Sequence, residues 1–202
     1  MRIIETRVYT FDELNDAAKQ RAREWYRSSG EGDNFWSECV IDGAKAFGTH
    51  MGFAIANIYW SGFCSQGDGA CFIGAWAAAN VNARELDADA PPDEALHAIC
   101  AALADAAARC PTAHLSITQT GRYSHSGSMK FDGEFESEFD GDPALIIAAR
   151  EAQGAAEQAA RDFADWIYNR LSEAYDWQNA DEQVDVGIIA HELEFTAAGR
   201  VV

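Results

Sequence analysis

The chain of 202 residues is long enough for one domain with a substantial core, and 48% hydrophobic residues with six Trp exclude a disordered protein. Asp and Glu number 33 against 15 Lys and Arg, which gives a formal net charge of −18. Such a surface repels nucleic acid and anionic membranes, and it attracts basic partners.

Membrane and export signals are not evident. The N-terminus, MRIIETRVYTFDEL, lacks the apolar core of a signal peptide, and no apolar run reaches the ~18 residues of a membrane span. The five cysteines form no CxxC pair, a pattern typical of reduced thiols rather than of a disulfide framework or a zinc site. We therefore expect a cytoplasmic protein that needs no metal or other cofactor.

The first fifty residues predict a strand and two helices. Residues 2–9 alternate weakly, as a strand does. A helix is expected to begin at Thr10, with Glu13 as its capping-box partner, and to end before the turn-rich residues 28–34. A second helix is predicted over about residues 35–51.

Residues 55–79 carry the most distinctive local pattern. Two β-rich runs, IYWSGF and ACFIGAW, flank SQGDG, so we predict that residues 59–63 pair antiparallel with residues 71–75 and form the central strands of the sheet. A four-residue loop at 66–69 would place Cys64 opposite Cys71. A two-residue turn at 68–69, the alternative that we favour, would put the two cysteines out of register.

The rest of the chain predicts a third helix, a second hairpin and two further helices. The third helix covers about residues 92–110, and the hairpin joins residues 114–123 to a return strand through SHSGS. A long helix follows over about 143–175, and a short one over 181–191. The Ala-rich middle of the long helix, around Gly154, should lie against another element, either of the same chain or of a second subunit in a homodimer. The predicted fold is a single α+β domain over residues 1–202, an antiparallel sheet built from two hairpins and packed against about five helices.

The return strand of the second hairpin, KFDGEFESEFDGD, has a strict period of two. Successive strand residues point to opposite faces, so Phe131, Phe135 and Phe139 should share one face. The opposite face should carry six carboxylates, which belong to Asp132, Glu134, Glu136, Glu138, Asp140 and Asp142.

Three interpretations of this acidic row compete. It is a nucleic-acid mimic that binds a basic protein, although one row is sparser in charge than a DNA strand. It is a calcium site, which is disfavoured because parallel side chains do not converge on one ion. Or it is a solvated edge strand whose charges deter aggregation.

Two loops supply secondary candidate residues. Ser65, Gln66 and Asp68 in SQGDG could hydrogen-bond to a partner, but the segment lacks the Gly-Lys-Ser/Thr ending of a phosphate loop. Tyr123, His125 and Ser126 in GRYSHSGSM suggest acid–base or nucleophilic chemistry, yet the chain has no GxSxG elbow and no HExxH metal spacing.

Three segments, VYTFDELNDAAKQRAREWY, IYWSGFCSQGDGACFIG and GRYSHSGSM, resemble a group of uncharacterised bacteriophage and prophage proteins. The shared pattern continues to a final DE.V…I…EFT..G and spans nearly the whole chain. The resemblance implies an intracellular phage accessory protein, and it supplies no catalytic residues.

Charge and resemblance together lead to one functional hypothesis. The protein is not an enzyme but binds a basic, nucleic-acid-binding surface of a host protein, as a counter-defence inhibitor of the anti-CRISPR or anti-restriction type. It is expected to bind neither nucleic acid nor membranes directly. The alternative is a small-ligand-binding protein or an enzyme that uses the SQGDG and YSHS loops.

Overall fold

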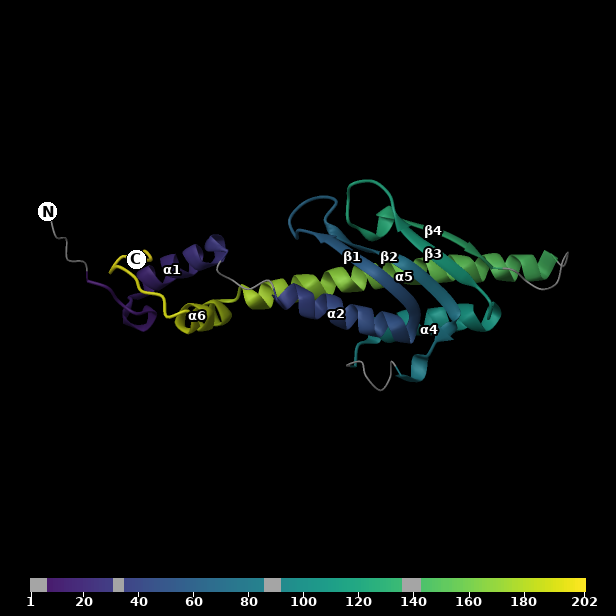
Figure 1. Ribbon diagram of the computed structural model, residues 1–202, viewed down its shortest axis with the longest axis horizontal. Helices are drawn as coiled ribbons and strands as arrows, with labels where there is room; N and C mark the ends of the chain where they lie inside the picture. Colours follow the sequence, from purple (N-terminus) through teal and green to yellow (C-terminus); the bar gives the residue numbers. More distant parts are fainter. Residues whose placement is uncertain (1–6, 31–34, 86–91, 136–142) are drawn as a thin grey trace. The chain divides into compact units, whose positions relative to one another are not determined.

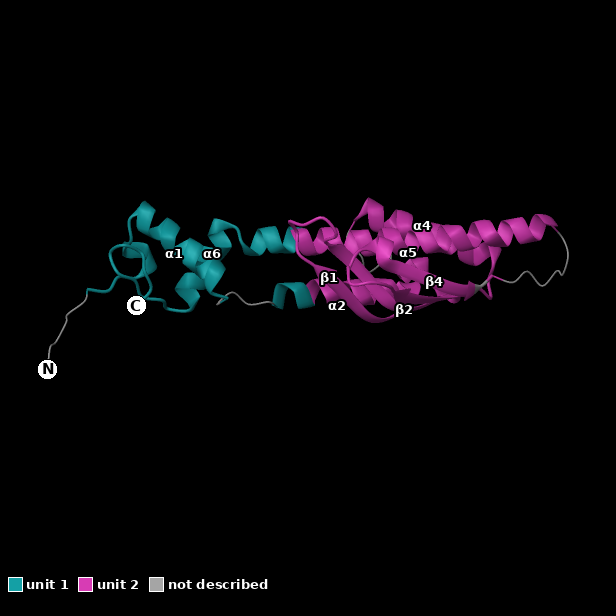
Figure 2. Ribbon diagram, turned by 90° about the horizontal axis from the view of Figure 1, so that it is seen from above, with its two compact units in different colours: residues 1–38, 173–202 teal, residues 39–172 magenta. Residues whose placement is uncertain are grey.

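The computed structural model describes residues 7–30, 35–85, 92–135 and 143–202. The chain divides into two compact units (Figure 2), which we call the sheet unit, residues 39–172, and the terminal unit, residues 1–38 with 173–202. Because the terminal unit is built from both ends of the chain, no linker marks a boundary in the sequence. The prediction of a single domain stays a prediction.

The sheet unit contains a four-stranded antiparallel sheet (Figure 1). Its strands are β1 (Met51–Ser61), β2 (Gly69–Val81), β3 (His114–Gln119) and β4 (Met129–Glu134), which pair in the order β1-β2-β3-β4. Tyr59 pairs with Cys71 in the first hairpin, and Ile117 pairs with Phe131 in the second. Both predicted hairpins are therefore confirmed, and with them the α+β class.

The connection in the first hairpin differs from both loops considered from the sequence. Ser61 pairs with Gly69, so residues 62–68 form the loop, and Cys71 lies opposite Tyr59 rather than Cys64. The reason is the side chain of Asp68, whose Oδ2 accepts the backbone N–H groups of Cys64 at 3.0 Å and of Ser65 at 2.6 Å. These bonds stabilise a wider loop than a two-residue turn.

Three helices pack on one face of the sheet: α2 (Phe35–His50), α4 (Glu94–Arg109) and α5 (Pro143–Gln178). The ring of Phe163 on α5 stacks on that of Phe53 on β1, with centroids 5.7 Å apart, and meets Phe72 on β2 edge-on. The ring of Phe163 also stacks on that of Trp166, which contacts Phe47 of α2 with centroids 6.1 Å apart. This aromatic cluster joins the helical layer to β1 and β2. Of these two, only β2 is a central strand, so the prediction that the first hairpin forms the centre of the sheet is wrong for β1, which is an edge strand.

Helix α5 begins at Pro143, as the sequence predicts. Its Ala-rich middle is buried on one side, which confirms that another element of the same chain packs there. The buried residues of that stretch are Ala149, Ala152, Ala156, Ala159 and Ala160. Gly154 is exposed, and a Cβ built on it would have no neighbour within 4 Å. The homodimer stays a prediction.

The terminal unit has a core of its own, built by α1 (Asp16–Ser29), α6 (Asp181–Ala190) and the C-terminal tail. Tyr9 and Phe195 form an isolated antiparallel bridge, so no strand exists in the described part of residues 2–9. The Thr10–Glu13 capping box is present, but it closes a 3₁₀ turn, Phe11–Glu13, and Asn15 caps α1. The predicted continuous helix is therefore wrong at its start, because Leu14 turns into the core in an extended conformation.

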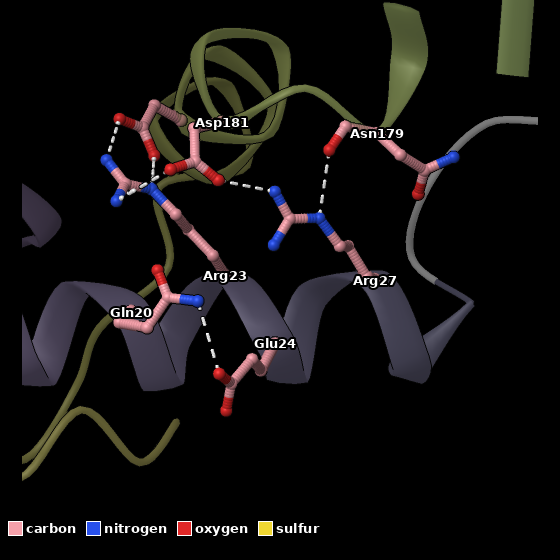
Figure 3. Close-up of polar contacts among 7 residues, drawn as sticks. Gln20, Arg23, Glu24, Arg27, Asn179 and Asp181 are labelled. Carbon is pink, nitrogen blue, oxygen red and sulfur yellow. Dashed lines mark hydrogen bonds and ion pairs between the residues drawn. The ribbon is translucent and has the colours of Figure 1, made fainter. Parts of the chain in front are cut away.

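Charged hydrogen bonds fasten α6 to α1 in the terminal unit (Figure 3). Arg23 donates from Nε and Nη2 to the two carboxylate oxygens of Asp185, both at 2.6 Å. Arg27 donates to Asp181 at 2.6 Å and to the carbonyl of Asn179 at 3.0 Å. The hydrogen bond with Asp185 raises the pKa of Arg23 despite partial burial, and the hydrogen bond from Arg27 lowers the pKa of Asp181.

We predict that Arg23 and Asp185 are energetically coupled. The side chain of Arg23 is only 19% exposed and that of Asp185 27%. Their bidentate contact should therefore contribute about 1–2 kcal/mol to the free energy of unfolding, more than a solvated ion pair does. A double-mutant cycle with Arg23→Ala and Asp185→Ala, followed by urea unfolding, measures this coupling. A coupling near zero would show that water replaces the contact.

Candidate functional site

The acidic strand begins as the sequence predicts. β4 forms one edge of the sheet, and Phe131 in it, like Phe135 just after it, turns toward the helical layer. The guanidinium of Arg161 on α5 lies 4.6 Å from the ring centroid of Phe131, and Phe135 stacks on Trp76 at 6.1 Å. Asp132 is exposed, on the face that does not meet the helices.

The structure places only part of the acidic row. Glu134 ends β4 opposite His114, so the described strand contains Asp132 and Glu134. Glu136, Glu138, Asp140 and Asp142 lie outside the described residues. On the open face of the sheet, Asp132 pairs across to Ser116, and Lys130 precedes it by two positions.

Part of the open face of the sheet consists of small and polar side chains. Ala54, Ala75 and Ser116 form one row across β1, β2 and β3, and all three are exposed. No helix within the described ranges covers this face. An uncovered face of this kind suits contact with another macromolecule better than enclosure of a small ligand.

The secondary candidates from the two loops come together in space. A Cβ built on Gly67 would lie 3.2 Å from Cδ1 of Tyr123, and one built on Gly69 would lie 2.6 Å from the Cβ of His125. The rings of Tyr123 and His125 stack with centroids 6.2 Å apart. The sequence could not show that the SQGDG and YSHS loops are neighbours in space, because Gly67 and Ser124 are 57 positions apart in the chain.

This loop pair is closely packed. The hydroxyl of Ser128 donates to the carbonyl of His125 at 2.7 Å, and the carboxylate of Asp68 already accepts two backbone N–H groups. Burial raises the pKa of Cys71 beneath the loops, in spite of a hydrogen bond with Ser128. Ser65 and Gln66 are exposed. A methyl group does not fit at Gly69, so the two loops are packed directly against each other there. These contacts indicate a structural role for the loop pair rather than a substrate cleft.

A groove between α4 and α5 adds carboxylates that sequence analysis missed. It encloses about 380 Å³, with a floor of small residues from α4 and a wall from α5 that includes Asp162, Asp165 and Trp166. Both aspartates are exposed. Asp162 and Asp165 are three positions apart, so the sequence can place them on one face of a helix. The groove also needs α4, about 65 residues earlier in the chain, and no local sequence pattern predicts that these two helices are neighbours.

The described ranges contain neither a metal-binding cluster nor a membrane-spanning helix. No three His, Cys, Asp or Glu side chains there gather closely enough to hold a metal ion. The helices of the same ranges are each too short or too polar to cross a membrane.

Comparison with known proteins gives one match. A family model described as "Domain of unknown function (DUF8835)" matches residues 36–181, which include the whole sheet unit. No curated protein and no solved structure matches the chain.

Proposed function

This chain belongs to the DUF8835 family, and we propose that it binds a basic, nucleic-acid-binding surface of another protein. The observation that carries the proposal is the formal net charge of −18 on 202 residues. Asp132 on the open face of β4 and the aspartates of the α4–α5 groove support it, since they present part of this charge on exposed surfaces.

A basic surface is the best partner for such a protein on electrostatic grounds. Opposite charge accelerates the encounter of two proteins, and it penalises acidic competitors by repulsion. A surface that normally binds nucleic acid already carries the required Lys and Arg residues. The resemblance to bacteriophage and prophage proteins makes a host defence complex in the bacterial cytoplasm, such as a CRISPR effector or a restriction enzyme, the first target to test.

The acidic row provides the test. Replacing Glu134, Glu136 and Glu138 by Gln keeps side-chain size and removes three charges, so capture of the partner should weaken at least about tenfold, mainly through slower association. The variant and the unmodified chain are compared as baits in a host lysate at low and high salt. A captured protein that a DNA duplex displaces from the bait supports the mimic.

A matched control removes three charges elsewhere. Glu24, Asp42 and Asp176 are exposed helical residues, so the triple variant E24Q/D42N/D176N has the same net charge as the test variant. The control variant should fold normally, because solvated positions contribute little to stability. If the test variant captures the partner as well as the unmodified chain does, with the same salt dependence, the acidic row does not bind the partner and is only a solvated edge strand.

The contacts between the SQGDG and YSHS loops do not favour the alternative of an enzyme or a small-ligand-binding protein. The ring of Tyr123 lies against Gly67, and the Cβ of His125 lies against Gly69, so both residues pack on the first loop. The proposal therefore assigns no catalytic residue.

A further inference from the structure

The terminal unit contains a groove of about 450 Å³ between the 3₁₀ turn Phe11–Glu13 and the C-terminal end of α6. Its apolar lining comes from Phe11, Ile188, Ile189 and Leu193, and its rim carries the carboxylates of Asp12, Glu192 and Glu194. The lining lies outside residues 36–181, so this groove belongs to the part of the chain that the family model does not match.

The acidic rim is not neutralised by the chain itself. Within the described residues, no Lys or Arg forms an ion pair with Asp12, Glu192 or Glu194. Lys19 and Arg23 lie over the ring of Phe11, at 5.4 Å and 5.7 Å from its centroid, and neither lines the groove. Arg23 is bound to Asp185 instead.

Glu192 occupies a backbone position where glycine is the usual residue. The N–H of Glu192 donates to the carbonyl of Ile189 at 3.0 Å, and that of Leu193 donates to Ile188 at 3.3 Å. This pair of bonds is a Schellman ending of α6, with Glu192 at the left-handed position and φ of 52°. A side chain there strains the backbone, and Glu192 is the only non-glycine residue of the described ranges with positive φ.

The apolar floor is also incompletely covered. Ile189 is 51% exposed, although the neighbouring Ile188 is fully buried in the core. An occupant that buries Ile189 and supplies positive charge to the rim would satisfy both features of the groove.

We propose that this groove binds a short basic segment of a partner protein, in which large apolar side chains are flanked by Lys or Arg. The apolar side chains contact Ile189 and Leu193, and the cations pair with Asp12, Glu192 and Glu194. The strain at Glu192 persists because a glycine at this position would remove one of the three rim carboxylates.

The test measures peptide binding and stability on the full chain. The probe is a fluorescein-labelled hexapeptide, Lys-Arg-Leu-Phe-Lys-Arg, with Lys-Arg-Ser-Ser-Lys-Arg as the control of equal charge. Fluorescence anisotropy should show at least about tenfold tighter binding of the first peptide. Equal affinity for both peptides would contradict the proposal, since it would reflect charge alone.

Three variants separate charge, strain and apolar contact. Glu192→Gly removes the carboxylate and the strain, so the urea midpoint should rise while peptide affinity falls about five- to tenfold. Glu192→Gln should weaken binding to the same extent with an unchanged midpoint. Ile189→Ser should also weaken binding, and its exposure keeps the cost to folding low. If Glu192→Gly gains stability and keeps full affinity, Glu192 is only an unfavourable helix end.

The E134Q/E136Q/E138Q variant distinguishes this groove from the acidic row. It should bind the hexapeptide within about twofold of the unmodified chain, because the two sites lie in different units. An equal loss in that variant would mean that the peptide responds to net charge, and the groove proposal would fail. The proposed function would not be affected by that result, because the lysate experiment tests it separately.

Discussion

Gly74→Ala is expected to lower the free energy of unfolding by about 3 kcal/mol, which combines backbone strain with steric conflict. Gly74 has φ of 154° and pairs with Ile55 at an irregularity in the β1–β2 register. A Cβ built on it would lie 2.1 Å from the carbonyl oxygen of Ala54. Because β2 is a central strand that also pairs with β3 at this residue, neither neighbour can move away freely.

The matched control is the same substitution at Gly154. This glycine lies in the interior of α5, where an added Cβ meets nothing within 4 Å, so Gly154→Ala should raise the free energy of unfolding by about 0.5–1 kcal/mol. Urea unfolding followed by far-UV circular dichroism measures both changes. A Gly74→Ala variant as stable as the unmodified chain would show that the two strands pair differently there.

Asp93→Ala should cost about 3 kcal/mol, because one carboxylate interacts with four partners. Oδ1 of Asp93 caps α4 by accepting the N–H groups of Ala95 and Leu96 at 3.0 and 3.1 Å. Oδ2 accepts the indole N–H of Trp166 at 2.8 Å and lies 3.8 Å from Arg170. Loss of a cap costs about 1 kcal/mol, and an unsatisfied buried N–H costs about 1–3 kcal/mol.

Asp93→Asn is the conservative comparison, since an amide oxygen can keep the cap or the indole bond but has no charge for Arg170. We expect a cost of about 1 kcal/mol. Burial raises the pKa of Asp93. The hydrogen bond from Trp166, the capping bonds and the charge of Arg170 lower this pKa by a larger amount, so the net shift is downward. Its contribution is thus present above the ordinary Asp pKa of about 3.9 and is lost as pH falls through the lower, folded value. Asp93→Asn should lose less stability than the unmodified chain between pH 5 and pH 2, and identical acid profiles would contradict this assignment.

Elements with strong local patterns could be predicted from the sequence. The apolar stripe that contains Leu96, Ile99 and Leu103 predicts α4, and those residues are buried. Pro143 marks the start of α5, and the alternation of Phe131 with Asp132 predicts the two faces of β4. These features depend on periodicity or on a fixed backbone angle, both of which are readable within a few residues.

Features that depend on distant side chains could not be predicted. The loop at residues 62–68 takes its length from the carboxylate of Asp68, which competes with the tight turn that Asp-Gly usually favours. The short break before α1 arises because Leu14 packs in the terminal unit, on a core completed by Phe195. The groove beside Glu192 needs both ends of the chain, so its acidic rim looks like ordinary surface charge in the sequence.

The composition of the terminal unit has a consequence for protein synthesis. The residues of α1 that face its core emerge from the ribosome well before α6, with the contiguous residues 39–172 between them. At roughly 5–20 residues per second, that interval lasts on the order of ten seconds, and the sheet unit can fold during it. Throughout that time Phe11 and Tyr26 lack Val184, Ile188 and Phe195, so the nascent α1 is the segment most open to chaperones and proteases. Translation that stalls before residue 181 would therefore leave a folded sheet unit with an unfinished, degradable N-terminal segment.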